Sequence, residues 1–252
     1  MSEPTDDLIT DTLWLLGKRD NTGGHAPDYW GNFAPQVVAQ SLRRFTQPDE
    51  LIIDPFVGYG TTLIEAVRHN RYAIGVDLNP DCTATAHTRA ASPRAVALTG
   101  DSTDPSTVDA VRAQMTHWGF AHAHLLMLHP PYHNIIRFSD HPADLSNAPT
   151  TEAFLERFGQ VVRNFAPLLE NGRFAVLVIG DRYTRGEWVP LGFYTMQAVL
   201  QHGFRLKSIC IKDIHEPRGK RHQHRLWRYR ALKHNFFVFA HEYVMFFERR
   251  AP

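Results

Sequence analysis

The sequence predicts an α/β fold built on a mostly parallel sheet with helices on both faces. Residues 51–53 are a continuous apolar run without alternation, which is typical of a parallel strand covered on both sides. From this run onward, short apolar segments of strand character alternate with segments of helical periodicity. Polar residues directly follow several of these strands, as expected where a parallel sheet binds ligands at the carboxyl ends of its strands.

Seven strands and the helices between them can be placed along the chain. Residues 1–32 look like an irregular lead-in, and residues 33–45 have apolar side chains at helical spacing with Pro35 in the first turn. Strands are expected at 51–53, 72–76, 95–98, 123–128, 174–179, 204–212 and 235–248. Helices are expected after residues 61–62, at 81–91, 104–117 and 191–201, and after a cap at Thr150 or Thr151.

Composition limits the class of protein. The 252 residues are 43% hydrophobic and 12% aromatic with a net charge of +1, which suits a globular protein and implies no partner from global charge. Cys82 and Cys210 form no motif, so free thiols in a reducing compartment are expected. No apolar run approaches about 18 residues and the first residues are acidic and polar, so neither a membrane span nor a signal peptide is expected, and the expected location is cytoplasmic.

The turn after the first strand is the element around which the other motifs are arranged. Gly58 and Gly60 allow a sharp turn and close approach of a ligand, and Thr61 and Thr62 can cap the next helix. Strand, turn and helix N-terminus then form a cradle with free N–H groups. The glycines match the start of a dinucleotide fingerprint, but Leu63 replaces the third, so a structural turn, a nicotinamide site and another ligand site all stay open.

Polar signatures follow successive strands and should share one rim of the sheet. They span residues 54–62, 77–79, 101–102, 129–132 and 181–185. Asp77 falls where a ribose-binding acid is expected, although Asn79 and Pro80 could equally begin a helix and Asp101 could be a loop turn.

The signature at 129–132 is His-Pro-Pro-Tyr. Pro130 and Pro131 fix the backbone and remove two donors, which leaves carbonyl oxygens unpaired beside the aromatic face of Tyr132. This arrangement suits a planar group held by acceptor bonds and stacking, and a stiff turn is the structural alternative.

Together these motifs resemble the S-adenosylmethionine-dependent DNA amino-methyltransferases. Residues 54–62 look like that family's Asp-Pro-Phe-x-Gly-Ser-Gly-Thr-Thr cofactor motif, residues 75–80 resemble its ribose-binding segment, and 129–132 resembles its catalytic (Asp/Asn/Ser)-Pro-Pro-Tyr. The resemblance spans about Trp30 to Arg185. It implies one domain over residues 1–252 with a three-layer Rossmann-like methyltransferase fold, whose seven-stranded, mostly parallel sheet ends in an antiparallel strand.

Two residues depart from the family pattern. Tyr59 replaces a small serine, and its ring is expected to point away from the ligand. His129 replaces the acidic, amide or hydroxyl residue that opens the catalytic tetrapeptide, which leaves cytosine and adenine both open as the target.

The resemblance implies methyl transfer from S-adenosylmethionine to the exocyclic amino group of cytosine (N4) or adenine (N6) in a flipped-out base, as in restriction–modification systems. The catalytic residues would be His129, Pro130, Pro131 and Tyr132. The Pro130 carbonyl and a neutral His129 would accept the amino hydrogens and Tyr132 would stack on the base, with His129 as a mere spacer left open. The cofactor would be held by Phe33, Pro35, Asp54, Pro55, Phe56, Gly58, Gly60, Thr61, Thr62, Asp77, Leu78, Asn79, Asp101 and Ser102.

Local charge points to nucleic acid. Residues 205–233 contain ten Lys and Arg residues but only two acidic residues, Asp213 and Glu216, and Trp227 and Tyr229 lie among them. This predicts a basic nucleic-acid-binding loop over 213–235, although a solvated loop is the alternative. The residues expected to grip the phosphates are Arg218, Lys220, Arg221, Arg225 and Arg228.

Other functions stay open at this point. An RNA amino-methyltransferase, a protein-glutamine methyltransferase, a non-catalytic nucleic-acid-binding protein and a nicotinamide oxidoreductase share parts of the pattern. No metal is expected, because the His122-x-His124 and His222-x-His224 pairs have no nearby Cys or carboxylate residues that would complete a zinc site. DNA is the expected partner with RNA still open, and the chain could be a monomer or a homodimer.

Overall fold

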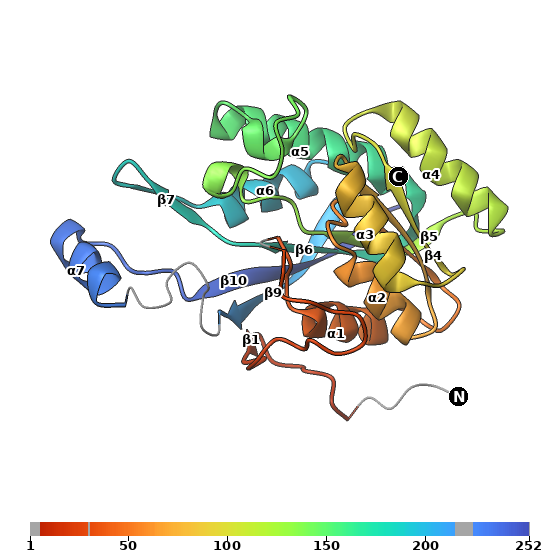
Figure 1. Cartoon of the computed structure of the whole chain (residues 1–252), viewed down its shortest axis with the longest axis horizontal. Coiled ribbons are helices and arrows are strands. Elements are labelled where there is room, and N and C mark those ends of the chain that lie inside the picture. Colours follow the sequence, from red (N-terminus) through yellow and green to blue (C-terminus); the bar gives the residue numbers. More distant parts are fainter. Residues whose placement is uncertain (1–5, 30, 215–223, 252) are drawn as a thin grey trace.

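A large twisted sheet forms the middle of the fold. The computed structural model describes residues 6–29, 31–214 and 224–251. The main sheet contains β1 (Leu13–Trp14), β2 (Leu51–Asp54), β3 (Tyr72–Asp77), β4 (Ala95–Thr99), β5 (Ala123–Leu128), β6 (Leu169–Ile179), β9 (Phe204–Asp213) and β10 (His241–Arg249). Its order is β1-β9-β10-β6-β5-β2-β3-β4, and β7 (Arg182–Thr184) with β8 (Glu187–Val189) forms a separate hairpin (Figure 1).

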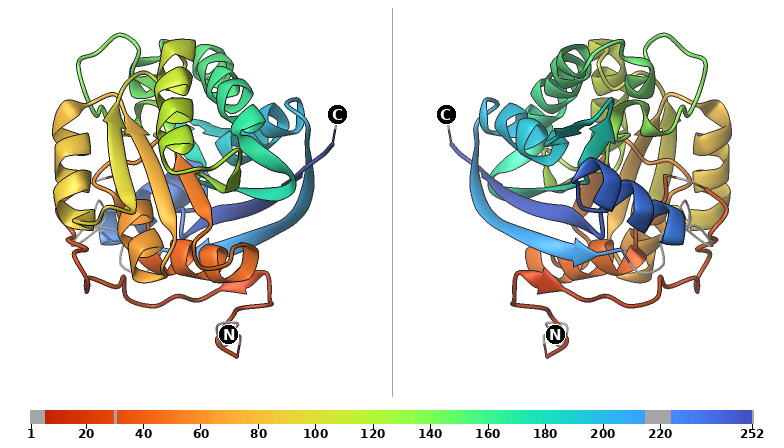
Figure 2. Two further views of the ribbon diagram at one scale, coloured as in Figure 1. Left: turned by 90° about the vertical axis from the view of Figure 1, so that its right-hand side faces the viewer. Right: turned by 90° about the vertical axis from the view of Figure 1, so that its left-hand side faces the viewer.

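Helices cover both faces of the sheet (Figure 2). One layer is α1 (Pro35–Phe45), α2 (Thr61–Arg68) and α3 (Pro80–Ala90), and the other is α4 (Pro105–His117), α5 (Thr151–Phe165) and α6 (Leu191–Leu200). A further helix, α7 (His224–His234), projects from the body, and short 3-10 turns lie at His133–Ile135, Leu145–Asn147 and Ala166–Leu168.

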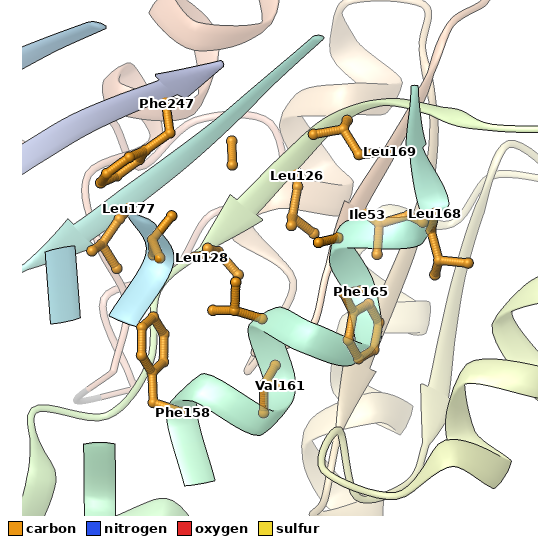
Figure 3. Close-up of a cluster of buried hydrophobic side chains, with 14 of the residues drawn as sticks. Ile53, Leu126, Leu128, Phe158, Val161, Phe165, Leu168, Leu169, Leu177 and Phe247 are labelled. Atoms are coloured by element: carbon orange, nitrogen blue, oxygen red, sulfur yellow. The ribbon is translucent and has the colours of Figure 1, made fainter. Parts of the chain in front are cut away.

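The strand period of two divides the core between the two layers. In β2, Leu51 and Ile53 belong to the cluster with α4–α6, whereas Ile52 belongs to the cluster with α1–α3. Figure 3 shows Ile53 in the first cluster together with Phe158 and Phe165 of α5. All five side chains are fully buried, and each contributes roughly 1.5–3 kcal/mol relative to exposure. The uninterrupted apolar run thus reflects burial on both faces, as predicted.

The predicted mostly parallel sheet with an antiparallel last strand is confirmed. Strand β10 pairs antiparallel with β6 and β9, and the β2–β3, β2–β5, β3–β4 and β5–β6 pairs are parallel. The count of seven strands is wrong, because β1 adds an eighth by pairing in parallel with β9, Leu13 opposite Ile211. Trp14 anchors this short strand by packing 5.8 Å from the ring of Phe246, so the lead-in is not wholly irregular.

Two segments outside the expected strands and helices contain regular structure. Residues 182–189 form the β7–β8 hairpin, and part of the basic segment is α7, so the last strand begins at His241 rather than at residue 235. Helix α7 was missed because it carries no apolar stripe that faces the core: Leu226, Tyr229 and Leu232 are exposed.

Two expectations from composition can be compared with the structure. Cys82 and Cys210 are buried free thiols. Within the described ranges, no helix combines the length and apolarity needed to cross a membrane.

Candidate active site

The turn between β2 and α2 depends on two glycines. Gly58 and Gly60 have φ of +51° and +90°, a region that other residues rarely adopt. A Cβ on Gly60 would lie 2.9 Å from Cα of Ala86 in α3, and one on Gly58 would lie 2.9 Å from Cε1 of Tyr29. The turn therefore packs backbone against its neighbours, with no room for a side chain at either position.

Asp54, the last residue of β2, is buried beneath this turn. It accepts a 2.9 Å hydrogen bond from the Phe56 N–H and another from the Thr62 hydroxyl. Burial raises the pKa of Asp54 to about 6, because these two bonds offset only part of the desolvation and the charge of Asp77 adds to it. The predicted cap by Thr61 and Thr62 is wrong: the N-cap is the preceding glycine in a left-handed conformation, with no side-chain bond, and Thr62 turns inward to Asp54.

Asp77, the last residue of β3, lies across the turn from α2. Its two carboxylate oxygens accept 2.9 Å bonds from the Gly58 and Asn79 N–H groups. Each oxygen keeps lone-pair capacity for a hydroxyl group of a ligand, and burial raises the pKa of Asp77. The alternative interpretation as a helix start also holds, since Asn79 caps α3 by accepting from Asp81 N, with Pro80 in the first turn.

The loop after β4 is tied to the turn by Ser102. Its hydroxyl donates a 2.8 Å bond to the carbonyl of Pro55. Asp101 accepts 2.8 Å bonds from the N–H and the hydroxyl of Thr103. It therefore also stabilises a loop turn, the structural alternative given for this residue above.

One pocket brings together most of the predicted site. Its lining includes Pro55, Phe56, Gly58, Asp77, Leu78, Asn79, Asp101, Ser102, His129, Pro130, Pro131 and Tyr132. The other predicted cofactor residues do not line it: Phe33, Pro35, Asp54, Gly60, Thr61 and Thr62. Phe33 supports the wall instead, by packing its ring 4.4 Å from that of His129.

The pocket also has walls that the sequence did not reveal. They come from the lead-in, from the segment after the tetrapeptide and from β10, and include Tyr29, Asn32, Ile135, Phe138, Asp144 and Glu242. Tyr59, the departure in the cofactor motif, is not among the lining residues and stacks on Tyr29 at 4.3 Å. No local pattern marks these residues, because only the folding of distant segments brings them to the rim.

The tetrapeptide 129–132 follows β5 and faces this pocket. His129 is half-buried, and burial lowers its pKa to about 4, with Glu242 opposing and Lys212 adding to the shift. The ring is therefore neutral at pH 7 and has one nitrogen free to accept. Among the described residues, none donates a hydrogen bond to the carbonyl of Pro130.

Tyr132 is held by a charged pair from the last two strands of the sheet. Its hydroxyl donates a 3.0 Å bond to Oε1 of Glu242, and Oε2 of Glu242 accepts a 2.8 Å bond from Nζ of Lys212. Burial and the charge of Glu242 raise the pKa of Tyr132 well above its usual value, so the hydroxyl stays protonated. The same oxygen lies 3.4 Å from Nε2 of His129.

The basic segment can be placed only in part. Arg218, Lys220 and Arg221 lie outside the described residues, whereas Arg225 and Arg228 are exposed on α7. Strand β9 is antiparallel to β10 and hence parallel to β6, so its carboxyl end reaches the rim where the tetrapeptide lies. Helix α7 and the β7–β8 hairpin both project beyond this rim (Figure 1).

Aromatic contacts join the hairpin to the chain that follows α7. Tyr183 stacks on Phe236 with ring centroids 4.4 Å apart, and Trp188 packs 4.3 Å from Phe239. The two projections are thus coupled at their bases. In the same described part of the chain, no group of three or more His, Cys, Asp or Glu side chains could hold a metal ion.

Comparisons with known proteins support the resemblance to DNA amino-methyltransferases. Residues 3–87 match the model of the N6/N4 family described as DNA methylase. The Type II methyltransferase M.MjaII of Methanocaldococcus jannaschii is 38% identical over 74 residues, and M.XycI of Xanthomonas campestris pv. cyanopsidis is 30% identical over 70. These matches cover 29% and 28% of this chain but only 14% and 22% of the relatives. The match to the family model ends at residue 87, before His129.

Solved structures show the fold. TrmN of Thermus thermophilus aligns with a TM-score of 0.54 at 16% identity, over 86% of this chain and 49% of its own. A TehB-like S-adenosylmethionine-dependent methyltransferase of Corynebacterium glutamicum aligns with a TM-score of 0.51 at 14% identity, over 85% and 88%. The architecture is therefore that of the Rossmann-like methyltransferases.

Proposed function

We propose that this chain belongs to the DNA amino-methyltransferases and transfers a methyl group from S-adenosylmethionine to the exocyclic amino group of cytosine (N4) or adenine (N6). The observation that carries the proposal is the pocket that joins Asp77 and the glycine turn to His129 and Tyr132. A methyl donor on the first side and a planar base on the second would face each other within one cavity, which is the positioning that group transfer requires.

The residues of the first side fit S-adenosylmethionine. Gly58 contributes backbone rather than a side chain to the pocket lining, and the carboxylate of Asp77 keeps acceptor capacity for ribose hydroxyls. Asp101 and Ser102 line the same side. When bound, the cofactor supplies an electrophilic methyl carbon.

The residues of the second side act on the amino group. Its nitrogen is a poor nucleophile because the lone pair is delocalised into the ring. The Pro130 carbonyl and a neutral His129 accept its two hydrogens and favour a pyramidal nitrogen with a free lone pair, and Tyr132 packs against the flipped base. Burial keeps His129 in the neutral form that this role needs.

In this proposal helix α7 binds the phosphate backbone of the DNA. Arg225 and Arg228 are exposed on a helix whose first turn holds no acidic residue, beyond the rim where a flipped base must enter. Replacing both by Gln should weaken DNA binding and reduce the salt slope by up to about 2, measured by fluorescence anisotropy between 50 and 200 mM salt. Over this range two phosphate contacts account for roughly a 10-fold loss of affinity. Arg112→Gln, at an exposed position of α4, is the matched control; an equal slope in the double variant and the wild type would exclude α7 from the interface.

Transfer of isotopically labelled methyl groups tests the proposed function. The enzyme, S-adenosylmethionine and duplex DNA should yield labelled DNA, and unlabelled DNA should compete better than RNA. Label transferred only to RNA would make the chain an RNA amino-methyltransferase, since the same residues could act on an amino group of an RNA base. Cofactor binding by calorimetry without transfer to either would indicate a non-catalytic binding protein.

A further inference from the structure

Four side chains form a continuous hydrogen-bonded chain from the sheet to the tetrapeptide, which we name the rim relay. Lys212 of β9 and Glu242 of β10 stand directly opposite each other in the antiparallel register. The relay runs from Lys212 Nζ to Glu242 Oε2 at 2.8 Å, from Glu242 Oε1 to the Tyr132 hydroxyl at 3.0 Å, and from that hydroxyl to His129 Nε2 at 3.4 Å. Lys212 and Glu242 lie outside the motifs that carry the family resemblance.

The donors and acceptors of the rim relay can be assigned by counting protons. Lys212 can only donate, and Glu242 accepts because Lys212, against the cost of burial, holds the pKa of Glu242 below its usual value. Tyr132 has one hydroxyl proton, and it goes to the carboxylate because a charge-assisted bond is the stronger one. Toward His129 the tyrosine oxygen can then only accept, so the proton in that contact must belong to Nε2.

We propose that Glu242, held by Lys212, is a positioning residue that fixes His129 as the Nε2–H tautomer and leaves Nδ1 as the atom that accepts a hydrogen of the target amino group. The second nitrogen is set by the hydrogen bond that the first one makes. The ring of Phe33, 4.4 Å from that of His129, limits its rotation. No described residue forms a hydrogen bond with Nδ1, which leaves it available to a ligand.

This inference deepens the proposed function and rests on it for the identity of the ligand. In the balanced step the amino nitrogen bonds to the methyl carbon, whose bond to sulfur breaks with its electron pair left on the sulfur, and the proton released from nitrogen passes to Nδ1. His129 then carries a proton on both nitrogens while Nε2–H still donates to Tyr132. The negative charge of Glu242, one hydroxyl away, stabilises the imidazolium that forms.

The tautomer can be measured without any reaction. The ¹⁵N shifts of histidine-labelled wild-type protein at pH 7 report which ring nitrogen is protonated, and the signal of His129 is identified by its absence from His129→Gln. The expected result is a protonated Nε2 and an unprotonated Nδ1. A protonated Nδ1 in the neutral wild-type ring would overturn the inference, whatever the enzyme's activity.

Reversing the polarity of the rim relay tests the role of Glu242. In Glu242→Gln the carboxamide accepts from Lys212 and donates to the Tyr132 oxygen, so the hydroxyl proton turns to Nε2 of His129 and the ring shifts toward Nδ1–H. We expect kcat to fall on the order of 100-fold, as for loss of a residue that orients a reactive group, with the KM for S-adenosylmethionine within about 2-fold. Unchanged tautomer and kcat in this variant would refute the positioning role.

Glu248→Gln is the matched control. Glu248 is also on β10 and bonds to cations of β9, Arg205 at 2.7 Å and Lys207 at 3.1 Å, but at the opposite end of the strand. It should leave the His129 tautomer and kcat unchanged, and a loss equal to that of Glu242→Gln would reduce the effect to general strand stability. A wild-type protein with protonated Nε2 but no methyl transfer would instead defeat the proposed function and leave the tautomer assignment standing.

Discussion

Replacing Asp54 by Asn should make the protein more stable at neutral pH. Asp54 is 1% exposed, and its carboxylate has only the Phe56 N–H and the Thr62 hydroxyl to offset the loss of water. Asn keeps the volume and one acceptor for the Phe56 N–H, and its NH₂ can donate to the Thr62 oxygen. The substitution therefore removes a buried charge without removing the local bonds.

The magnitude follows from the pKa of the carboxyl group. Burial raises the pKa of Asp54 from 3.8 to about 6, so the folded protein holds this proton more tightly than the unfolded chain does. The stabilisation is fully present below pH 3.8 and is lost as the pH rises through about 6. A pKa difference of about 2 corresponds to about 3 kcal/mol, which is the amount by which ionised Asp54 lowers the free energy of unfolding at pH 8.

Urea denaturation at several pH values between about 3 and 8 measures this effect. The free energy of unfolding of the wild type should fall relative to that of Asp54→Asn by about 3 kcal/mol across this range, with unchanged m-values. Asp104→Asn is the control, because Asp104 is an exposed N-cap whose pKa is lowered by its bond from Ser106. Parallel stability–pH curves for wild type and Asp54→Asn would refute the idea of a destabilising charge under the turn.

Three further predictions concern the two sides of the pocket. Gly60→Ala should cost roughly 1–3 kcal/mol more stability than Gly119→Ala, because both have positive φ but only the first Cβ meets backbone within 2.9 Å; equal melting temperatures would remove the packing argument. Asp77→Asn should weaken S-adenosylmethionine binding by about 1.5–3 kcal/mol in calorimetry, since hydrogen bonds to a charged acceptor are lost, and an unchanged Kd would exclude Asp77 from the ribose site. His129 must be neutral to accept and its pKa is lowered to about 4, so its contribution to kcat should persist from pH 8 to 5 and fall near pH 4; a His129→Asn enzyme with wild-type kcat and the same acid limb would reduce His129 to a spacer.

Local signals were sufficient to predict most of the sheet and several of the residues that line the pocket at its rim. The run at residues 51–53 is apolar because a strand buried on both faces needs apolar side chains throughout, and Gly60 is glycine because of its own backbone conformation. Asn79 and Pro80 mark a helix start by their own chemistry. Such features can be read from sequence because each one satisfies a constraint on its own stretch of chain.

Features that depend on distant partners were not predictable. Thr62 has the side chain of a cap, yet its hydroxyl bonds to Asp54, which only the sharpness of the turn brings within reach. Strand β1 is two residues long and exists because β9 offers it an edge. Glu242 reaches Tyr132 across 110 positions of sequence, so its part in the rim relay depends on the antiparallel register of β10.

Mass spectrometry of nucleosides tests the central claim most directly. DNA incubated with the wild-type protein and S-adenosylmethionine is digested to nucleosides and compared with DNA incubated with Asp77→Asn. We predict N4-methylcytosine or N6-methyladenine in the first sample and a much smaller amount in the second, because the pocket joins the proposed cofactor side to the His129 side. DNA that contains neither methylated nucleoside, from a protein shown to bind the cofactor, would contradict the account.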